Sequence, residues 1–410
     1  MAAVLQHFKH VLVCLPGVPA VAEDQLATLR DEFFGHIVDN VPEGGLRARD
    51  FLPGAIFFVA GDVRVILRRP NDISVDKLRL IRSFRPSDVV FPRMIEEVEL
   101  GELPRTVYGV GVYFPGIFNT SAHSFYDELH AAHEYQELTE SNKAGVSYRK
   151  GRYLSRVTAE DNGDLKYHLL RCSTNFQVPT ENFRPVDDLI VGKAQEAANL
   201  AFGNTAAELN HVLAQVYHNT ASTPLSASAK EAKARIKSHS DKTKDMPLDG
   251  IMAFCTFYSP DIADKAKISP DGNYMYKNGS VLTTLRWTLK PSVNPGAGYK
   301  ESFSVLLHPN SLLLVPLSTN RLYTHEIVPP QLPVDKIPTR LGYVVRCSKT
   351  LAVSRDGETL VNGNPLVRPT DEQLEELRRL YKEENCSTEV VRYEDVSFSM
   401  NSGDYLPPVL

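Results

Sequence analysis

His239-Ser240-Asp241 is the most informative stretch of this sequence, together with a second histidine, His325, further along the chain. Residues at i and i+2 of an extended segment project to the same side, so His239 and Asp241 can reach one ion together. Two imidazoles and one carboxylate on one side of a metal leave three positions open, which is the ligand set of non-heme iron(II) oxygenases. The sequence therefore predicts that His239, Asp241 and His325 bind one metal ion and form a catalytic centre.

The His-x-Asp pair is a weak signal when it is taken alone. The chain has 12 histidines and 50 acidic residues among 410, so about 1.5 His-x-acid pairs are expected by chance. The alternatives are a surface histidine beside a solvated aspartate, and for His325 a structural histidine near the end of a strand. The context favours the metal site, because the pair follows a polar segment and precedes the apolar run 251–258.

Two arginines follow His325 and have the spacing of one strand face. Arg340 and Arg346 lie six residues apart, so their side chains project to the same side of an extended segment. Buried cations are costly unless they have anionic partners, and a guanidinium can grip a carboxylate with two parallel hydrogen bonds. This spacing favours a bound anionic co-substrate over two unrelated structural arginines.

Four segments in this order resemble the motifs of the AlkB-like iron(II)/2-oxoglutarate-dependent dioxygenases. They are Leu209-Asn210 through Gln215-Val216-Tyr217, then His239-Ser240-Asp241-Lys242, then Arg321-Leu322-Tyr323-Thr324-His325-Glu326-Ile327, and then Arg340-Leu341-Gly342-Tyr343-Val344-Val345-Arg346. The resemblance covers roughly residues 205 to 350, about a third of the chain. It implies a double-stranded β-helix, a distorted jelly roll, that holds iron(II) and 2-oxoglutarate.

The resemblance also implies a role for individual residues. His239, Asp241 and His325 would ligate iron(II). Arg340 would hold the distal carboxylate of 2-oxoglutarate, Tyr217 would donate a hydrogen bond to it, and Arg346 would lie near the keto-acid end. The implied reaction oxidises a C–H bond and releases succinate and carbon dioxide.

The chain departs from this family at positions that face the substrate. Thr243 stands where the family's repair enzymes carry an acidic residue, and Gly342 and Gln215 stand where asparagine is frequent. The separation between His239 and His325 is long for the family, and the excess lies near residues 261–300, a Gly/Pro/Asn-rich segment that could cover a pocket. These departures favour a small-molecule substrate, such as an amino acid or related metabolite.

The alternative is AlkB- or TET-like oxidation or demethylation of a methylated nucleobase in DNA or RNA, and a third hypothesis is a non-catalytic binding protein on the same fold. A net charge of -5 and a pI of about 6.2 give no overall attraction for nucleic acid. A local basic run could still contact phosphates or could belong to a solvated loop. Its members are Lys230, Lys233, Arg235, Lys237, Lys242 and Lys244.

The bulk properties indicate an ordinary globular enzyme of the cytoplasm. The composition is 42% hydrophobic and 23% charged. The five cysteines are widely spaced and are expected to be reduced thiols. No stretch has the length and hydropathy of a membrane span, so no membrane partner is expected. The sequence leaves the oligomeric state open.

The expected fold class is α+β with three parts. An N-terminal α+β unit is expected over 1–118, the double-stranded β-helix oxygenase domain over 119–355, and a helical extension and tail over 356–410. Helices are expected at 20–38, 74–84, 121–138 and around 193–202, and a hairpin at 55–67. Thr370 and Gln373 form a capping box that predicts the start of a C-terminal helix. His130 and His133 are expected on a solvated helix face.

Overall fold

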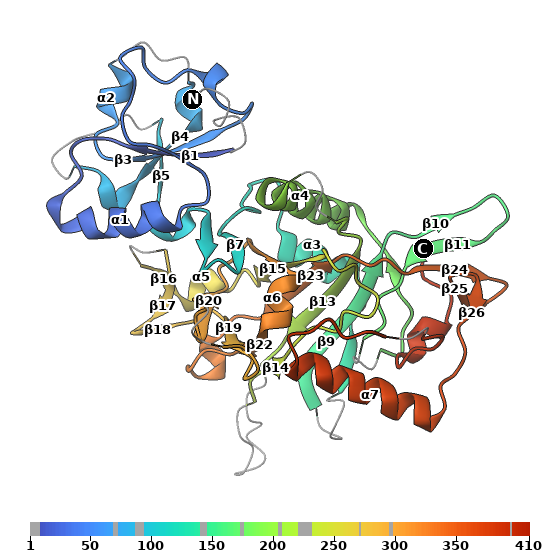
Figure 1. The fold of residues 1–410 in the computed structure, drawn as a ribbon. Helices are drawn as coiled ribbons and strands as arrows, with labels where there is room; N and C mark the ends of the chain where they lie inside the picture. Colours follow the sequence, from blue (N-terminus) through green and yellow to red (C-terminus); the bar gives the residue numbers. More distant parts are fainter. Residues whose placement is uncertain are drawn as a thin grey trace. The chain divides into compact units, whose positions relative to one another are not determined.

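The computed structural model describes residues 9–68, 73–86, 94–139, 146–172, 176–203, 207–219, 232–269, 272–294, 298–393 and 396–410. The chain divides into two compact units. Unit 1 comprises residues 1–115 and 268–274, and unit 2 comprises residues 116–267 and 275–410. Helices and several sheets make up the chain, which is therefore a mixed α+β protein (Figure 1).

Unit 1 contains a five-stranded parallel sheet in the order β2-β1-β3-β4-β5. Its strands are β1 (His10–Cys14), β2 (His36–Val38), β3 (Ile56–Ala60), β4 (Leu78–Ile81) and β5 (Glu96–Val98). Alternate residues of β1 and β3 enter two separate hydrophobic clusters, so both faces of the sheet are covered. The helices are α1 (Glu23–Glu32) and α2 (Arg64–Leu67), and a hairpin of β6 (Arg105–Val107) and β7 (Gly111–Phe114) follows.

Three expectations for this unit were wrong in detail. The helix expected over 20–38 ends at Glu32. Residues His36–Val38 pair with β1 instead, and Gly35 just before them lies so close to β1 that an added Cβ would be 2.4 Å from the carbonyl of His10. The hairpin expected at Gly61-Asp62 is a strand-to-helix turn, in which the Asp62 carboxylate accepts a 3.0 Å bond from the backbone of Arg64.

The third error concerns residues 74–84, where the helix period was misread. Their central part is β4, in which Leu78 and Leu80 are buried on the same side and alternate with Arg79. The neighbouring residues Val75–Lys77 and Arg82–Phe84 are single 3-10 turns. Leucines at i and i+2 fit a strand. The segment is too short for its apolar pattern to distinguish a helix from a strand, and the pairing with β3 makes it a strand.

Unit 2 is built on a large sheet with the order β12-β9-β13-β23-β15-β21. The strands are β9 (Val146–Ser155), β12 (Glu181–Asn182), β13 (His211–Tyr217), β15 (Ile251–Tyr258), β21 (Ser311–Pro316) and β23 (Arg340–Arg346). Its central neighbours are antiparallel, with Tyr217 and Tyr258 on either side of Arg340. One face of this sheet lies against α3 (Phe125–Ala132) and α4 (Pro185–Phe202), since Tyr343 donates a 2.7 Å bond to Asp187 of α4 (Figure 1).

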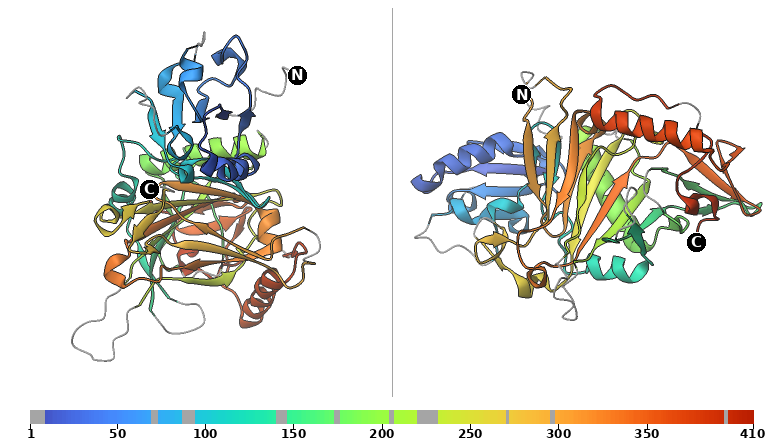
Figure 2. Two further views of the ribbon diagram at one scale, coloured as in Figure 1. Left: turned by 90° about the vertical axis from the view of Figure 1, so that its left-hand side faces the viewer. Right: turned by 90° about the horizontal axis from the view of Figure 1, so that it is seen from below.

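The opposite face of the large sheet meets a smaller antiparallel sheet with the order β14-β22-β19-β20 (Figure 2). Its strands are β14 (Ile236–His239), β19 (Thr284–Leu289), β20 (Ser302–Leu306) and β22 (Tyr323–Val328). Phe254 of the large sheet makes ring contacts with Trp287 and His325 of the small one, at 6.1 and 5.6 Å between centroids. Two antiparallel sheets therefore enclose a common interior.

The remaining elements are a third sheet and several short segments, of which β16 and β17 lie at the boundary between the two units. A third sheet has the order β10-β11-β24-β25-β26. Its strands are β10 (Thr158–Ala159), β11 (Leu165–His168), β24 (Leu351–Arg355), β25 (Glu358–Val361) and β26 (Asn364–Pro365). The shorter elements are β8 (Gln136–Thr139), α5 (Ile262–Lys265), β16 (Lys267–Ile268), β17 (Tyr274–Tyr276), β18 (Gly279–Ser280) and α6 (Leu317–Leu322).

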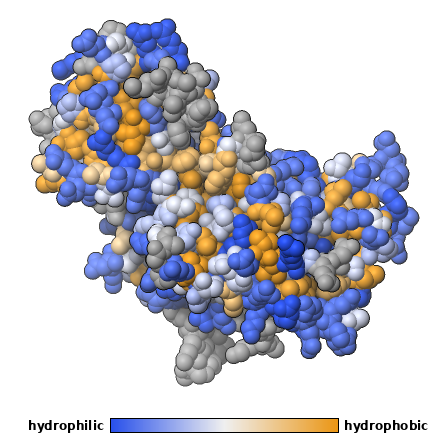
Figure 3. All heavy atoms as spheres, viewed as in Figure 1, coloured by the Kyte–Doolittle hydropathy of each residue, from blue (hydrophilic) through white to orange (hydrophobic). Residues whose placement is uncertain are grey.

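The C-terminal helix α7 (Asp371–Cys386) begins as expected, with the capping box between Thr370 and Gln373. Its exposed positions are mostly charged, and its outer surface is accordingly hydrophilic in Figure 3. The helix expected over 121–138 is shorter, because α3 ends at Ala132 and β8 follows. His133 is buried rather than solvated and contacts Glu181 and Asp187 at 3.1 and 2.9 Å.

Among the described residues, no helix has the length and apolar character needed to cross a membrane. All five cysteines lie in the described part of the chain, and no disulfide joins them.

Candidate metal centre

His239, Asp241 and His325 converge at one end of the space between the two facing sheets of unit 2. Their ligand atoms lie within 4.8 Å of one another. Nε2 of His239 is 3.5 Å and Nε2 of His325 is 3.7 Å from Oδ1 of Asp241. The two imidazole rings are 4.5 Å apart between centroids. The predicted triad is thus assembled in space, across 86 positions of sequence.

Strand pairing brings the two histidines together. His239 is the last residue of β14 and lies opposite His325 of β22 in the register of the small sheet. In β22, buried residues alternate with more exposed ones, so that Tyr323, His325 and Ile327 point to the interior. The ring of His325 also lies 4.8 Å from that of Trp287 on the next strand, which fixes its inward orientation.

Asn320 holds the backbone of Asp241 through two hydrogen bonds. The Asp241 amide donates to Oδ1 of Asn320 at 2.9 Å, and Nδ2 of Asn320 donates to the Asp241 carbonyl at 2.9 Å. Asn320 is 2% exposed and lies in α6, just before β22. The sequence reading missed this residue, because nothing in the pattern around it signals a contact 79 positions away.

The donor set and its spacing fit a first-row divalent metal ion. Two donors about 2.1 Å from one ion and at right angles to each other lie about 3 Å apart. The observed separations of 3.5 and 3.7 Å need only a small contraction to reach that value. Two imidazole nitrogens and one carboxylate oxygen are the donors that suit iron(II) with open positions for other ligands.

The charge states of the triad also suit metal binding. Burial and, to a smaller extent, the neighbouring His239 lower the pKa of His325 to about 3, so the ring is neutral near pH 7. Burial by itself would raise the pKa of Asp241. The contact with His239 and the charge of Arg346 outweigh burial and hold that pKa well below its usual range. A neutral imidazole and an ionised carboxylate are the forms that ligate a metal.

Arg340 and Tyr217 lie together on the interior face of the large sheet. They are cross-strand partners, and the guanidinium carbon of Arg340 is 3.8 Å from the centre of the Tyr217 ring. Arg340 is 4% exposed, and its Nε and Nη2 have no hydrogen-bond partner in the described part of the chain. The Tyr217 hydroxyl donates a 2.9 Å bond to Gln215. A buried cation without an anionic partner indicates a place for an anion.

Arg346 lies on the same face, at the other end of β23. Its Nη1 is 3.5 Å from Oδ2 of Asp241, and the residue is 2% exposed. The two arginines predicted to share a strand face therefore do so, and one of them reaches the triad. Gly342 lies between them, where an added Cβ would be 2.8 Å from Nη1 of Arg340 and 3.2 Å from the Tyr217 ring. The glycine leaves the space that the Arg340 side chain occupies.

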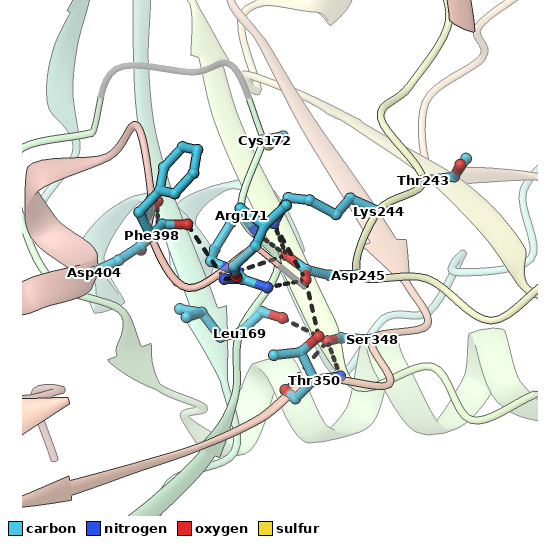
Figure 4. Close-up of polar contacts among 12 residues, drawn as sticks. Leu169, Arg171, Cys172, Thr243, Lys244, Asp245, Ser348, Thr350, Phe398 and Asp404 are labelled. Atoms are coloured by element: carbon cyan, nitrogen blue, oxygen red, sulfur yellow. Dashed lines mark hydrogen bonds and ion pairs between the residues drawn. The ribbon is translucent and has the colours of Figure 1, made fainter. Parts of the chain in front are cut away.

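The loop after Asp241 is anchored by a buried polar cluster (Figure 4). Asp245 is 1% exposed and accepts hydrogen bonds from the backbone and guanidinium of Arg171 at 2.6 to 3.1 Å and from Thr350 at 2.9 Å. The Arg171 guanidinium also donates to the carbonyls of Val396 and Phe398. This cluster ties the segment next to the triad to Thr350, just before β24, and to the C-terminal residues.

The basic run does not form one exposed surface. Lys242 and Lys244 are buried; Lys242 donates to the carbonyl of Tyr381 at 2.8 Å, and Lys244 is 3.2 Å from the Asp245 carboxylate. Both interpretations of the basic run, a solvated loop and a contact with phosphates, are therefore wrong for these two buried lysines. Lys233 donates to the carbonyl of Pro330, and Lys230 lies outside the described residues. Of the six, Arg235 and Lys237 are clearly exposed.

The segment 261–300 was expected to be an insertion that covers a pocket. Part of it belongs to the core instead, because β19 pairs with β20 and β22 and buries Leu285 and Trp287. Apolar residues at alternate positions 285 and 287 were the signal for this strand. Residues 270–271 and 295–297 of the segment lie outside the described ranges.

A cavity of about 500 Å³ lies at the loop that follows Asp241, and its lining includes none of the three triad residues. Asn320 and Thr243 line it, together with charged side chains of both signs, among them Lys290, Arg321 and Glu384. The Thr243 amide donates to Glu384 at 3.0 Å, so a carboxylate from α7 stands next to Thr243. This volume is in the range of small-molecule sites.

Neither a protein-family model nor a curated protein matches this sequence. Among solved structures, the chain is similar to SnoN, a non-heme alpha-ketoglutarate-dependent epimerase from nogalamycin biosynthesis. The two share 10% identity with a TM-score of 0.33, and the alignment covers 59% of this chain and 80% of SnoN. A likeness of this size assigns no role to any residue of this chain.

Proposed function

We propose that this protein is an iron(II)/2-oxoglutarate-dependent oxygenase of the AlkB-like type, with a double-stranded β-helix core in unit 2. One arrangement carries the proposal: a His-Asp-His triad and an unpaired, buried Arg340 face the same interior of a two-sheet sandwich. The first supplies metal ligands, and the second supplies a counter-charge for a carboxylate. Iron(II) in such a site activates dioxygen when 2-oxoglutarate is bound.

The roles of the side chains follow from their chemistry. His239, Asp241 and His325 would hold the metal, and Asn320 would keep Asp241 in place. Arg340 would hold the distal carboxylate of 2-oxoglutarate with Tyr217 beside it, and Arg346 would face the keto-acid end. Trp287 and Phe254 would line the interior beside His325 and exclude water from it.

For the substrate we propose a small polar molecule, such as an amino acid or related metabolite, whose C–H bond is oxidised. Thr243 and Gly342, at positions where the family's repair enzymes carry other residues, support this choice, and a net charge of -5 gives little attraction for a phosphate backbone. The buried state of Lys242 and Lys244 removes two of the cations that a phosphate backbone would have used. Oxidation of a methylated base in DNA or RNA is the alternative that the assay below includes.

The first test is metal binding, and the chain offers its own probe. Trp287 is the single tryptophan, and its ring is 4.8 Å from that of His325, so a paramagnetic ion in the site should quench its fluorescence. We expect saturable quenching by manganese(II) or anaerobic iron(II) in the wild type and none in Asp241→Ala. His133→Gln, a buried histidine outside the triad, is the control and should retain quenching. Equal quenching of Asp241→Ala and the wild type would refute the metal site.

The second test is turnover. Succinate formation from 2-oxoglutarate, measured across amino acids and methylated oligonucleotides, should be stimulated by one class of compound. Stimulation by amino acids with no effect of oligonucleotides would support the proposed substrate. Salt-sensitive stimulation by a methylated oligonucleotide would replace it with the nucleic-acid alternative. A metal-loaded protein that makes no succinate and binds no 2-oxoglutarate would end the oxygenase proposal.

A further inference from the structure

His211 is a buried histidine for which the triad gives no role. It is the first residue of β13, it is 0% exposed, and neither ring nitrogen has a hydrogen-bond partner in the described part of the chain. A neutral imidazole carries one N–H donor and one acceptor nitrogen. Leaving a buried donor or acceptor unsatisfied is unfavourable, because the group has lost its hydrogen bonds to water. The position is therefore costly unless something binds the ring.

Strand register places His211 directly opposite Arg346. The two residues are cross-strand partners in the β13–β23 pair, so their side chains project from the same face of the sheet. Nε and Nη2 of Arg346 also have no hydrogen-bond partner among the described residues, while its Nη1 reaches Asp241. A histidine with two unbonded ring nitrogens thus lies beside two unbonded guanidinium nitrogens of an arginine that reaches the triad.

The opposite end of the same two strands repeats this arrangement. Tyr217 ends β13 opposite Arg340, just as His211 begins β13 opposite Arg346. Each arginine therefore has an aromatic polar neighbour on β13, and both pairs face the same interior. The two arginines are six residues apart, which corresponds to about 20 Å along a strand. Their long side chains can close this span on a short molecule that has an anionic group at each end.

The surroundings of His211 favour hydrogen bonding by a neutral ring. The Tyr153 ring lies 5.1 Å away on the neighbouring strand β9. Burial, together with the charge of Arg346, holds the pKa of His211 well below its ordinary value. The ring is therefore an uncharged donor next to a permanent cation, and both can donate to one carboxylate or keto oxygen.

We propose that His211 is a further co-substrate-binding residue: with Arg346 it holds the 2-oxo-acid end of 2-oxoglutarate, while Arg340 and Tyr217 hold the distal end. This inference rests on the proposed function. His211 donates one hydrogen bond to the acid end and thereby fixes the ligand against the face that carries the triad. It contacts the ligand and has no part in holding the metal.

The test measures co-substrate binding without turnover. Anaerobic iron(II) protein is titrated with 2-oxoglutarate, and binding of the keto acid to the metal is followed by the metal-to-ligand charge-transfer absorption. His211→Phe should weaken 2-oxoglutarate binding by about tenfold to a hundredfold, the effect of one hydrogen bond to a charged group. His211→Gln keeps a donor and an acceptor and should lose about threefold or less. Should His211→Phe fail to fold, His211→Asn takes its place, because its amide is too short to reach the ligand.

Two controls separate this role from a structural one. Manganese(II) affinity, read from Trp287 fluorescence, should be unchanged in the His211 variants. His133→Gln removes a buried histidine from the opposite side of the sheet, where Asp187 contacts both His133 and Tyr343. It should leave 2-oxoglutarate affinity at the wild-type value even if it lowers the melting temperature.

The outcomes also separate this inference from the proposed function. If wild-type protein binds metal and 2-oxoglutarate and His211→Phe binds 2-oxoglutarate equally well, the role of His211 is refuted and the oxygenase proposal stands. If both His211→Phe and His211→Gln lose affinity for manganese(II), His211 acts on the metal site and the proposal is also refuted. If wild-type protein shows no charge-transfer absorption and no 2-oxoglutarate binding, the proposed function itself fails.

Discussion

Arg340 combines deep burial with a guanidinium that stacks on an aromatic ring. Its guanidinium lies 3.8 Å from the centre of the Tyr217 ring, and two of its nitrogens lack hydrogen-bond partners in the described structure. Cation–π contact contributes about 0.5–2 kcal/mol, which is less than the cost of desolvating a cation. A bound carboxylate would supply the missing interaction.

Replacing Arg340 should therefore affect ligand binding more than folding. Removing one partner of a buried, charge-assisted pair costs about 2–5 kcal/mol of binding free energy. We expect Arg340→Ala to weaken 2-oxoglutarate binding by at least about thirtyfold. The fold should tolerate the change, because no carboxylate among the described residues pairs with this cation and would be left buried alone. Isothermal titration of the manganese(II) protein gives the affinity, and an unchanged affinity would contradict the assignment.

Gly342 offers a gentler test of the same site. A methyl group at this position would meet Nη1 of Arg340 at 2.8 Å, and the flexible end of that side chain would have to move off the Tyr217 ring. We expect Gly342→Ala to lower 2-oxoglutarate affinity by about tenfold, since bidentate contacts depend on orientation. Gly192→Ala, in α4 with no atom within 4 Å of the added methyl group, is the matched control and should bind normally.

At the scale of elements, α7 is positioned by both of its ends. The hydroxyl of Thr370 accepts a hydrogen bond from the amide of Gln373, which completes the capping box. At the other end, Lys242 donates to the carbonyl of Tyr381 and Lys290 to that of Glu384. Cations near the last carbonyls of a helix are favourable because of the helix dipole. Lys242 thereby connects the loop after Asp241 to α7, and Lys290 connects the end of β19 to the same helix.

Removing the N-terminal cap should destabilise α7 by a predictable amount. Loss of an N-cap hydroxyl typically costs about 1 kcal/mol of the free energy of unfolding. We expect Thr370→Ala to lose about that much, and Thr370→Ser to lose little because it keeps the hydroxyl. Urea unfolding followed by Trp287 fluorescence measures the change. Equal stability of Thr370→Ala and the wild type would show that the cap does not contribute.

The sequence identified long elements and the ligand order better than it identified short elements. The apolar run 251–258 coincides with β15, and α7 starts at the capping box that predicts it, because a continuous apolar run and a capping box are local signals. The parallel sheet of unit 1 was missed, since three-residue strands such as β2 carry no period of their own. The triad could be proposed from motif order, but the pairing of its two histidines and the contact with Arg346 depend on strand register.

Buried polar residues were the least predictable part of the site. His211, Asn320 and Asp245 all lie far in sequence from the groups that they face. Their residue types are common on protein surfaces, so nothing in the local pattern distinguished them. Lys242 and Lys244 show the same limitation, because a basic run suggests solvent exposure until the acceptors on α7 and at Asp245 are known.

At the scale of the whole molecule, two buried aspartates in the C-terminal cluster respond to pH in opposite directions. The pKa of Asp404 is raised to about 6 from 3.8, because burial disfavours its charged form. The pKa of Asp245 is lowered instead, because Lys244 and Arg171 outweigh burial. Both residues belong to the polar cluster around Arg171 in Figure 4.

These shifts predict an optimum in stability at mildly acidic pH. Folded Asp404 retains its proton between about pH 4 and 6, where the unfolded chain has lost it, so its contribution falls as pH rises through about 6. The ionised form of Asp245 stabilises the fold above pH 4, and that contribution falls as pH decreases further. The free energy of unfolding should therefore be highest near pH 4, decline from about pH 4 to pH 6, and receive no further change from Asp404 at higher pH.

Asp404→Asn tests this prediction, because the amide cannot ionise yet its oxygen can still accept the bonds from Ser399 and Asn401. The variant should keep its stability up to pH 8, gaining on the order of 2–3 kcal/mol over the wild type there, the equivalent of a shift of about two pKa units. Asp356→Asn, at an exposed turn, is the control and should follow the wild-type profile. Urea unfolding at several pH values, followed by Trp287 fluorescence, gives the comparison for unit 2. Parallel pH profiles for Asp404→Asn and the wild type would show that Asp404 is ionised in the folded protein at neutral pH without cost.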